Sequence, residues 1–407
     1  MVKASDLRMT DRQIEAAIAP LLASDSQESA VDYFAAIAWS VICEPGDSIA
    51  GLLVNHFGPA RALQLELERA DSDLYSSELK NDSSTSSRAK FAETLEAARQ
   101  RWSARFSMGR VLESCALMAA KSAWFVTDKS QSWPAGLNDL DNHAPRGLWG
   151  VGNPDCLKDI SKSISFVGSR IASRYGDEVC PDLISPLVDR EYAIVSGGAY
   201  GIDAMAHRAT IAVGGLTVAM MAGGLDRLYP SGNRELFRRL ETEGLILSEM
   251  PPGAEPTKWR FLQRNRLIAA LGRATVVVEA NPRSGAVSTA NRAIELERPL
   301  GAVPGPINSP GSDGCHILIR EGKAELVTCA QDILEMIQPS GFDANSEIAG
   351  LGALETRVLD VIGFGNVNWE TIRAEAGLTN SELNLGVSGL SLMGLIEQHS
   401  GGWQRKH

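Results

Sequence analysis

Gly168, Ser169 and Arg170 form the first of several short clusters in which glycine, serine and arginine follow an apolar, β-rich run. Glycine permits a tight turn and a close approach of the backbone to a ligand. The serine hydroxyl can donate a hydrogen bond, and the arginine fork matches two phosphate oxygens at once. These residue types favour phosphate binding, although this cluster alone is also compatible with a plain turn and a surface arginine.

A second cluster contains Ser196, Gly197, Gly198 and Gly201 at the expected start of a helix. Backbone amides at a helix start bind anions when no side chain blocks them. A dinucleotide fingerprint would need glycine where Ser196 stands, and the next strand ends without an acid. A phosphate-binding loop of the G-x-x-x-x-G-K-[ST] type is also missing from the sequence. We therefore expect an anion site that uses neither NAD nor any other cofactor.

Asp203 and His207 lie four residues apart on one face of the same expected helix. The pair could act as a general acid and base. We favour a capping or packed role instead, because an acid early in a helix complements the helix dipole. We accordingly expect no catalytic residue and no metal site.

The third cluster is the stretch 259–266, which reads WRFLQRNR and precedes an apolar helix expected at 262–271. Its basic residues include Arg264 and Arg266, with Asn265 between them, and the aromatic residues Trp259 and Phe261 are interleaved. Such a pattern suits single-stranded nucleic acid, because cations follow the phosphates and rings stack on bases. A solvated helix start with both rings in the core is an equal alternative from this feature alone.

Two further loops complete the series. Arg283, Ser284 and Gly285 follow a buried strand and precede a helix, and a Pro/Gly-rich loop at 304–314 precedes another short helix. Five loops of this kind along one edge of a sheet would form a continuous rim that binds anions. A rim of that length exceeds the needs of one mononucleotide, and it favours a polymer of phosphates.

The elements that must position these loops are strands and helices in alternation. Strand-like runs are expected at 123–127, 164–167, 192–196, 216–222, 245–248, 274–279, 300–303 and 325–327. Helical patterns separate most of them, which is typical of an α/β fold with a doubly wound, mostly parallel sheet. Ligands of such folds bind at the carboxyl ends of the strands, where the five loops lie.

Helical patterns also fill residues 1–122, which we expect to form an N-terminal helical domain ahead of the sheet domain at 123–338. Within it, 51–62 could be a helix-hairpin-helix turn that holds a DNA backbone, although an ordinary helix–helix turn is favoured. The serine-rich stretch 80–88 is expected to be a loop.

Residues 339–352 read as a linker, and 353–407 as a winged-helix domain with helices at 354–362, 369–376 and 380–392 before a hairpin. Its third helix carries almost no charge apart from Glu382. We therefore favour a protein-interaction role for it over reading of a DNA groove.

Composition sets limits on these interpretations. The chain has 407 residues, a net charge of −11 and six cysteines without a C-x-x-C pair. The charge argues against a protein that coats DNA indiscriminately, but screening leaves room for a local basic groove. The charged N-terminal residues and short apolar runs lead us to expect a cytoplasmic protein without a membrane span.

With these motifs in order, the sequence resembles the DNA-processing protein A family (DprA, also called Smf) over roughly 125–337. The resemblance rests on the ordered set FVGSR, VSGGAYGIDAMAHRAT, GGLDRLYPSGNRELF, LSEMPPG, RNRLIAAL, RSGAVSTANRAIE and VPGPINSPGSDGCHILIREG. It implies an extended Rossmann fold that forms homodimers, binds single-stranded DNA and delivers it to the RecA recombinase in natural transformation and recombination. The DNA-binding residues that it implies are Gly168, Ser169, Arg170, Ser196, Gly197, Gly198, Gly201, Arg264, Asn265, Arg266, Arg283, Ser284 and Gly285.

The sequence departs from the family pattern at two places. His316 stands where the family usually has asparagine, so we leave it out of the site. Leu262 and Gln263 stand where proline and a basic residue are more frequent, which removes one positive charge.

A nucleotide phosphoribohydrolase on a related fold is the main alternative function. Such enzymes use a P-G-G-x-G-T-x-x-E loop, whereas in the loop from Pro282 the glycine pattern is broken and no acid follows at the matching spacing. A pure adaptor that has lost DNA binding is disfavoured by the loop arginines.

Overall fold

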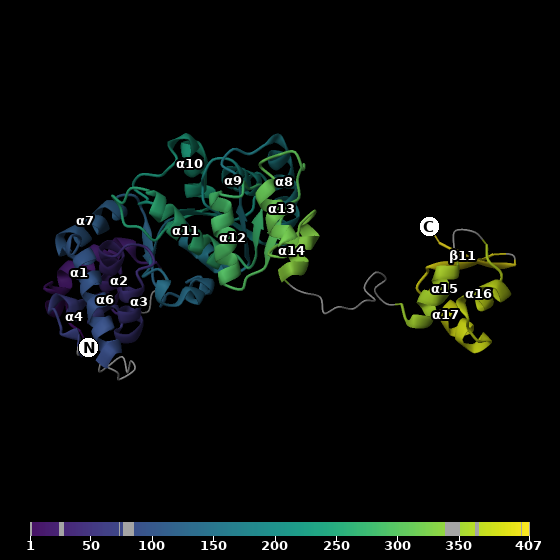
Figure 1. Cartoon of the computed structure of the whole chain (residues 1–407), viewed down its shortest axis with the longest axis horizontal. Coiled ribbons are helices and arrows are strands. Elements are labelled where there is room, and N and C mark those ends of the chain that lie inside the picture. Colours follow the sequence, from purple (N-terminus) through teal and green to yellow (C-terminus); the bar gives the residue numbers. More distant parts are fainter. Residues whose placement is uncertain are drawn as a thin grey trace. The chain divides into compact units, whose positions relative to one another are not determined.

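The computed structural model describes residues 2–23, 28–72, 74–75, 85–337, 351–362, 366–399 and 401–406. The chain divides into two compact units, Met1–Gln338 and Pro339–His407 (Figure 1). Each unit is described by itself.

One sheet organises the first unit. Within the described residues it has nine strands in the order β1-β2-β6-β5-β4-β3-β7-β8-β9. All neighbours from β6 to β9 in that order are parallel, whereas β2 runs antiparallel to both β1 and β6. This confirms the predicted doubly wound, mostly parallel sheet. The strands are β1 (Trp124–Val126), β2 (Leu148–Gly152), β3 (Ser163–Val167), β4 (Ala193–Ser196), β5 (Thr217–Met221), β6 (Leu245–Ser248), β7 (Thr275–Val277), β8 (Leu300–Ala302) and β9 (Glu325–Leu326).

Helices cover both faces of the sheet (Figure 1). Successive strand residues point to opposite faces, so Phe166 packs in one apolar cluster with α8 and α9 while Val167 packs in another with α11 and α12. The helices are α8 (Arg174–Val188), α9 (Ile202–Ala212), α10 (Arg234–Glu243), α11 (Lys258–Leu271), α12 (Gly285–Glu295), α13 (Asp313–Arg320) and α14 (Ala330–Ile337). Two elements, β2 and α14, were not predicted from the sequence.

The direction in which the chain adds strands reverses next to β3. From β3 it proceeds through β4 and β5 to β6 on one side, and it then returns through α11 to place β7 on the other side of β3. In open α/β sheets the crevice outside the strand ends at such a reversal is the usual place for a ligand.

Helices before residue 123 pack against one edge of this sheet. The Tyr33 hydroxyl lies within hydrogen-bond distance of the carbonyl oxygens of Leu21 and Phe125, and Leu22 forms a parallel bridge with Phe125 of β1. The helices are α1 (Asp11–Ile18), α2 (Ala30–Ile42), α3 (Ser48–Phe57), α4 (Pro59–Leu67), α6 (Thr85–Ser103) and α7 (Met108–Ala119).

Short 3₁₀ helices complete the first unit, at η1 (Ala4–Leu7), η2 (Ala19–Leu21), η3 (Ala135–His143), η4 (Pro154–Ser161) and η5 (Ser231–Asn233). Of the loop predicted at 80–88, residues 80–84 lie outside the described part of the chain. Residues 85–88 belong to α6, so the prediction of a loop was wrong for them. The glycine-centred break at 51–62 is the turn between α3 and α4, at Gly58.

Within the described residues, the second unit contains three helices followed by an antiparallel hairpin. The helices are α15 (Ala353–Val361), α16 (Trp369–Ala376) and α17 (Asn380–Leu392), and the strands are β10 (Ile396–His399) and β11 (Gly402–Arg405). This order of elements was predicted, and its assignment as a winged helix stays a prediction. Of the predicted linker 339–352, residues 339–350 lie outside the described part of the chain.

Candidate functional site

A cavity of about 780 Å³ opens where β3 and β7 end, at the reversal of the sheet. Five segments line it: the loop after β3, the start of α9, the loop between β5 and η5, one face of α11, and the loop that leads from β7 into α12. The residues that line it include Gly168, Ser169, Arg170, Asp203, Tyr229, Lys258, Phe261, Arg264, Asn265, Asn281, Ser284 and Gly285.

Positive charge predominates among these side chains. Arg170 and Lys258 are exposed, and neither forms an ion pair with any residue that the structure describes. Arg264 adds a third cation, and Asp203 contributes a carboxylate to the lining. The cavity therefore presents to an incoming anion two exposed cations that have no carboxylate within ion-pair distance among the described residues, although Asp203 attracts Arg170 and Arg264 from farther away.

Arg264 lies at the floor of the cavity and is only 6% exposed. Its Nη1 donates to the carbonyl oxygens of Gly197 (2.6 Å) and Met220 (2.8 Å). Position 197 requires glycine, because a Cβ there would lie 2.0 Å from Arg264 Nη1. Burial lowers the pKa of the guanidinium to about 10, with Asp203 acting in the opposite direction. Arg264 thus stays charged at neutral pH, and it lies buried within α11 rather than in a loop at the surface.

The first turn of α12 opens into the same cavity. Ser284 is the N-cap residue, but its hydroxyl makes no capping hydrogen bond, and its Oγ is buried without a hydrogen-bond partner among the described residues. Gly285, the first helical residue, is exposed, with space where a Cβ would lie. The first amides of a helix have no partner within the helix and carry its positive dipole end. This arrangement can accept an anion from the cavity.

Phe261 provides an aromatic surface between the cations. Its ring lies 5.1 Å from the guanidinium carbon of Arg170 and 5.7 Å from that of Arg264. The centre of the Tyr229 ring lies 5.9 Å from the centre of the Phe261 ring, and Tyr229 is half exposed. Tyr229 and Asn281 were missed by sequence reasoning, although Tyr229 lies within the motif GGLDRLYPSGNRELF.

Comparison with known proteins gives this arrangement a family. The model of the DNA recombination-mediator protein A family matches residues 124–338, which contain the whole cavity. The chain belongs to this family. The resemblance to DNA-processing protein A noted in the sequence is thereby confirmed.

Individual relatives agree with this assignment. A DNA processing protein DprA of Mycobacterium tuberculosis is 39% identical over 323 residues, covering 75% of this chain and 82% of that protein. The DprA of Streptococcus pneumoniae is 44% identical over 202 residues, covering 50% of this chain and 70% of that protein. The X-ray structure of the S. pneumoniae protein matches 74% of this chain and 95% of its own, with a TM-score of 0.57 and 32% identity.

Several residues that the DprA resemblance implied do not line the cavity. Ser196 is fully buried and donates to the carbonyl of Phe166, and Gly198 is buried beside it. Gly201 has a φ of +74°, and a Cβ there would lie 2.1 Å from the carbonyl oxygen of Ser169. These residues, together with Gly197, shape the loops that hold Arg264 and the β3 loop. Ser169 lines the cavity, but its hydroxyl donates to the carbonyl of Ile171 (2.8 Å).

Two of the predicted arginines point elsewhere. Arg266 is paired with Glu249 at 2.8 Å, and both side chains are nearly buried, at 6% and 11% exposure. It lines a separate cavity of about 410 Å³, together with Trp259 and Gln263 from the same helix. Arg283 is exposed and is absent from the lining of the main cavity. The basic stretch 259–266 therefore does not act as one surface.

Asp203 and His207 occupy structural positions. Asp203 accepts a hydrogen bond from the backbone N–H of Ala199 (3.4 Å), and burial raises its pKa. His207 is fully buried beside the Thr217 hydroxyl (Nδ1–Oγ1 2.7 Å), and burial lowers its pKa to about 3. A histidine that is neutral at pH 7 and buried away from the cavity is unsuited to proton transfer with a ligand.

His316, one of the two departures from the family pattern, lies in α13, with its Nε2 3.0 Å from the carbonyl oxygen of Gly305 in the loop after β8. Among the described residues, no helix has the length and apolar character to span a bilayer. The same part of the chain holds no cluster of three or more potential metal ligands.

Proposed function

We propose that the cavity between β3 and β7 binds the backbone of single-stranded DNA and does no covalent chemistry on it. The observation that carries this proposal is the combination of charges and helix end at one place. Two exposed cations without a carboxylate in ion-pair distance among the described residues, a buried third cation and an uncapped helix start all line one cavity. Phosphate groups match this set, because guanidinium forks and helix amides both bind phosphate oxygens.

A single strand fits the cavity better than a duplex does. Phe261 and Tyr229 expose aromatic surface beside the cations, and an unpaired base can stack there while its phosphate stays near Arg170. A duplex keeps its bases stacked inside and offers only its phosphates. We therefore expect single strands to bind more tightly at the same salt concentration.

Binding without catalysis agrees with the carboxylates of the cavity. Hydrolysis of an N-glycosidic bond or phosphodiester needs a group within reach that can transfer a proton. Asp203 is engaged by the backbone of Ala199 and is the acid of the lining set. The glycine-poor loop from Pro282 contributes no second acid to that set.

Membership of a recombination-mediator family extends the proposal to a partner. We propose that the protein acts as a homodimer and delivers its bound strand to the RecA recombinase during DNA uptake and recombination. Under this proposal, the helices before residue 123 and the predicted winged helix at 353–407 are separate domains attached to the DNA-binding sheet.

A fluorescence-anisotropy titration tests the DNA-binding step. The full chain is titrated against a labelled thymidine oligonucleotide and against a duplex of the same length. We expect a lower Kd for the single strand, and a Kd for Arg170→Ala that is about tenfold higher, the loss of roughly one charge-assisted hydrogen bond. Arg238→Ala is the matched control, since it removes an exposed arginine of α10 that pairs with Glu235. Equal binding of both DNA forms, or an unchanged Kd for Arg170→Ala, would contradict the proposal.

A further inference from the structure

Helix α11 has a second functional face besides the one in the cavity. Lys258, Phe261 and Arg264 line the cavity, whereas Arg260 and Arg266 contact carboxylates outside it. The contacts on this second face come partly from the turn between α2 and α3, residues 43–47, which belongs to the N-terminal helices. We call this segment the α2–α3 turn.

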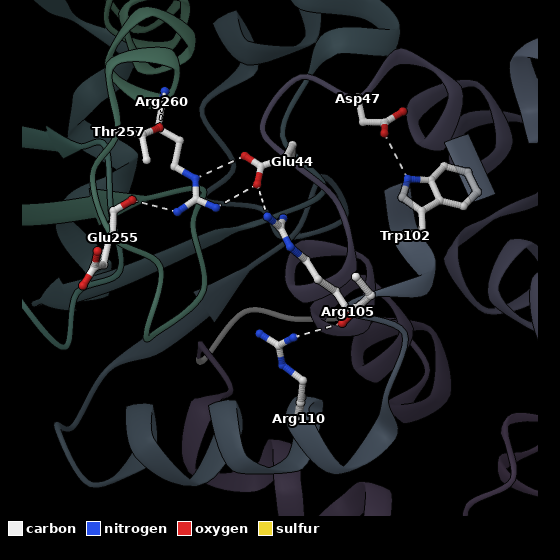
Figure 2. A network of polar contacts seen from close by, with 9 residues as sticks. Glu44, Asp47, Trp102, Arg105, Arg110, Glu255, Thr257 and Arg260 are labelled. Carbon is white, nitrogen blue, oxygen red and sulfur yellow. Dashed lines mark hydrogen bonds and ion pairs between the residues drawn. The ribbon is translucent and has the colours of Figure 1, made fainter. Parts of the chain in front are cut away.

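Glu44 in the α2–α3 turn holds Arg260 through both of its carboxylate oxygens. Arg260 Nη2 donates to Oε1 at 2.7 Å and Nε donates to Oε2 at 3.1 Å. Arg105, from the segment between α6 and α7, donates to the same Oε1. Figure 2 shows Glu44 between the two guanidinium groups, with Arg260 on one ribbon and Arg105 on another. One carboxylate thus joins three segments that are far apart in the sequence.

Arg260 in turn fixes the first turn of α11. Its Nη1 donates to the carbonyl of Glu255 (2.7 Å), which precedes the helix. Its backbone N–H donates to the Oγ1 of Thr257, the N-cap residue. The Arg260 side chain is 12% exposed, although its hydrogen bonds to Glu255 and Thr257 lie at the surface. Lys258 lies two residues before Arg260 and Phe261 one residue after it, so a shift of this turn moves both cavity residues.

The rest of the α2–α3 turn fits closely against α11. Gly46 has a φ of +73°, and a Cβ there would lie 2.7 Å from Gln263 Oε1 and 3.2 Å from Arg266 Nε. Its backbone N–H donates to Glu249 Oε1 (3.3 Å), the carboxylate that also pairs with Arg266. A turn held this tightly cannot slide along the helix without breaking the ion pairs.

We propose that Glu44 is a positioning residue for the DNA site: it locks the start of α11 so that Lys258 and Phe261 face the bound strand. This inference rests on the proposed function of the cavity. Glu44 does not line the cavity and therefore acts on DNA only through Arg260.

The direction in which Glu44→Ala changes the Kd for DNA distinguishes a positioning role from a purely electrostatic one. Removing a negative charge near a DNA site should tighten binding of a polyanion if charge alone matters. Positioning predicts the opposite for Glu44→Ala, because the first turn of α11 is released. We expect its Kd for the thymidine oligonucleotide to rise about five- to tenfold, in the range of couplings within one ion-pair network. A Kd that is lower or unchanged would overturn the proposal.

A double-mutant cycle tests the route through Arg260. Arg260→Ala should weaken binding about as much as Glu44→Ala, and the double variant should be no weaker than either single variant. Additive effects of the two substitutions would contradict the route. Glu255→Gln is the matched control, because it removes an acid near the same turn whose side chain is 78% exposed and pairs only loosely with Arg227, at 3.5 Å. We expect its Kd to be unchanged or slightly lower.

Partial unfolding is separated from repositioning by two further readouts. A variant that is partly unfolded loses binding capacity at saturation but keeps the Kd and the salt dependence of its folded fraction. Repositioning of Lys258 instead lowers the slope of log K against log salt by about 0.7, one phosphate contact. If Glu44→Ala does not fold, the near-isosteric Glu44→Gln replaces it, with the same expected rise in Kd and fall in the slope of log K against log salt. An unchanged Kd and an unchanged slope would overturn the proposal.

Measurements on the wild-type protein and on Arg170→Ala distinguish a failure of the proposed DNA-binding function from a failure of the positioning role of Glu44. If wild type fails to bind single strands, or Arg170→Ala binds as tightly as wild type, the proposed function fails. If both behave as expected and the Glu44 variants bind like wild type, only the positioning role fails.

Discussion

On the cavity face of α11, Lys258 and Arg264 have no carboxylate within ion-pair distance among the described residues, whereas on the opposite face Arg260 and Arg266 are each held by one. All four cations lie within nine consecutive positions of one helix. The carboxylates on the second face, Glu44 and Glu249, come from other segments. The difference shows that positively charged residues close together in the sequence can have separate roles: those on one face are available to a ligand, and those on the other hold segments of the fold together. Substitutions on the two faces should therefore affect different measurements.

The largest effect is expected from Arg266→Ala on the second face. Removing this arginine leaves Glu249, at 11% side-chain exposure, without its partner in a nearly buried position. We expect a loss of about 3 kcal/mol in the free energy of unfolding, measured by urea denaturation. Arg239→Ala, which breaks an exposed pair on α10, should leave the free energy of unfolding nearly unchanged. Similar losses for the two variants would remove the distinction between the faces.

The next largest effect is expected from the double variant Arg170→Ala, Lys258→Ala, and it concerns the free energy of DNA binding instead of unfolding. Both side chains are exposed and form no ion pair among the described residues, so the free energy of unfolding should hardly change. Loss of two phosphate contacts should raise the Kd for a single strand about 100-fold, roughly 2.7 kcal/mol. The slope of log K against log salt should fall by about 1.4. An unchanged slope would show that these cations do not meet phosphates.

Phe261→Ala tests the aromatic surface of the cavity face. Loss of one stacked base should cost about 1–2 kcal/mol of binding free energy, and the salt slope should stay as in wild type. Phe261→Tyr retains a ring and should bind like wild type in the same anisotropy titration. If Phe261→Leu also restored full affinity, apolar packing rather than stacking would explain the contribution of this position.

The smallest effect is expected from the pH dependence of the Glu44 network. Burial acts to raise the pKa of Glu44, but hydrogen bonds from Arg260 and Arg105 outweigh it, and the pKa lies below its ordinary value of 4.5. The stabilisation is therefore complete above about pH 4.5 and is lost as pH falls through the lower, folded-state pKa. Because Glu44 is one-third exposed, the difference between wild type and Glu44→Gln should be under about 1 kcal/mol. Thermal unfolding at several pH values should show this difference shrinking in acid.

The start of α11 illustrates what the sequence could and could not predict. The helix was expected from Leu262, but it begins at Lys258 because Thr257 caps it. That capping signal was readable in the sequence. With the earlier start, Phe261, Arg264 and Ile268 follow helical spacing and share the cavity face. The partner of Arg260 is 216 residues away, and no local pattern could have indicated it.

The place of the cavity was partly predictable. Alternating strands and helices indicated a parallel sheet, and the loops after β3 and β7 were both expected to carry the site. The strand order was not predictable, because pairing of β3 with β7 depends on how the whole sheet packs. Strand β2 was missed because Gly150 and Gly152 weaken the β pattern of its sequence. The glycine cluster near Ser196 was assigned to ligand contact, whereas Gly197 accommodates Arg264 and Gly201 accommodates the backbone of the loop after β3.

The separation between Glu44 and Arg260 also matters while the chain is being made. The ribosome adds roughly 5–20 residues per second, so about 10–40 s pass between synthesis of these two residues, which are 216 positions apart. During that interval the carboxylate of Glu44 can pair with Arg105, which emerges first. The N-terminal helices can therefore assemble before the sheet, and α11 then joins a turn that has already formed.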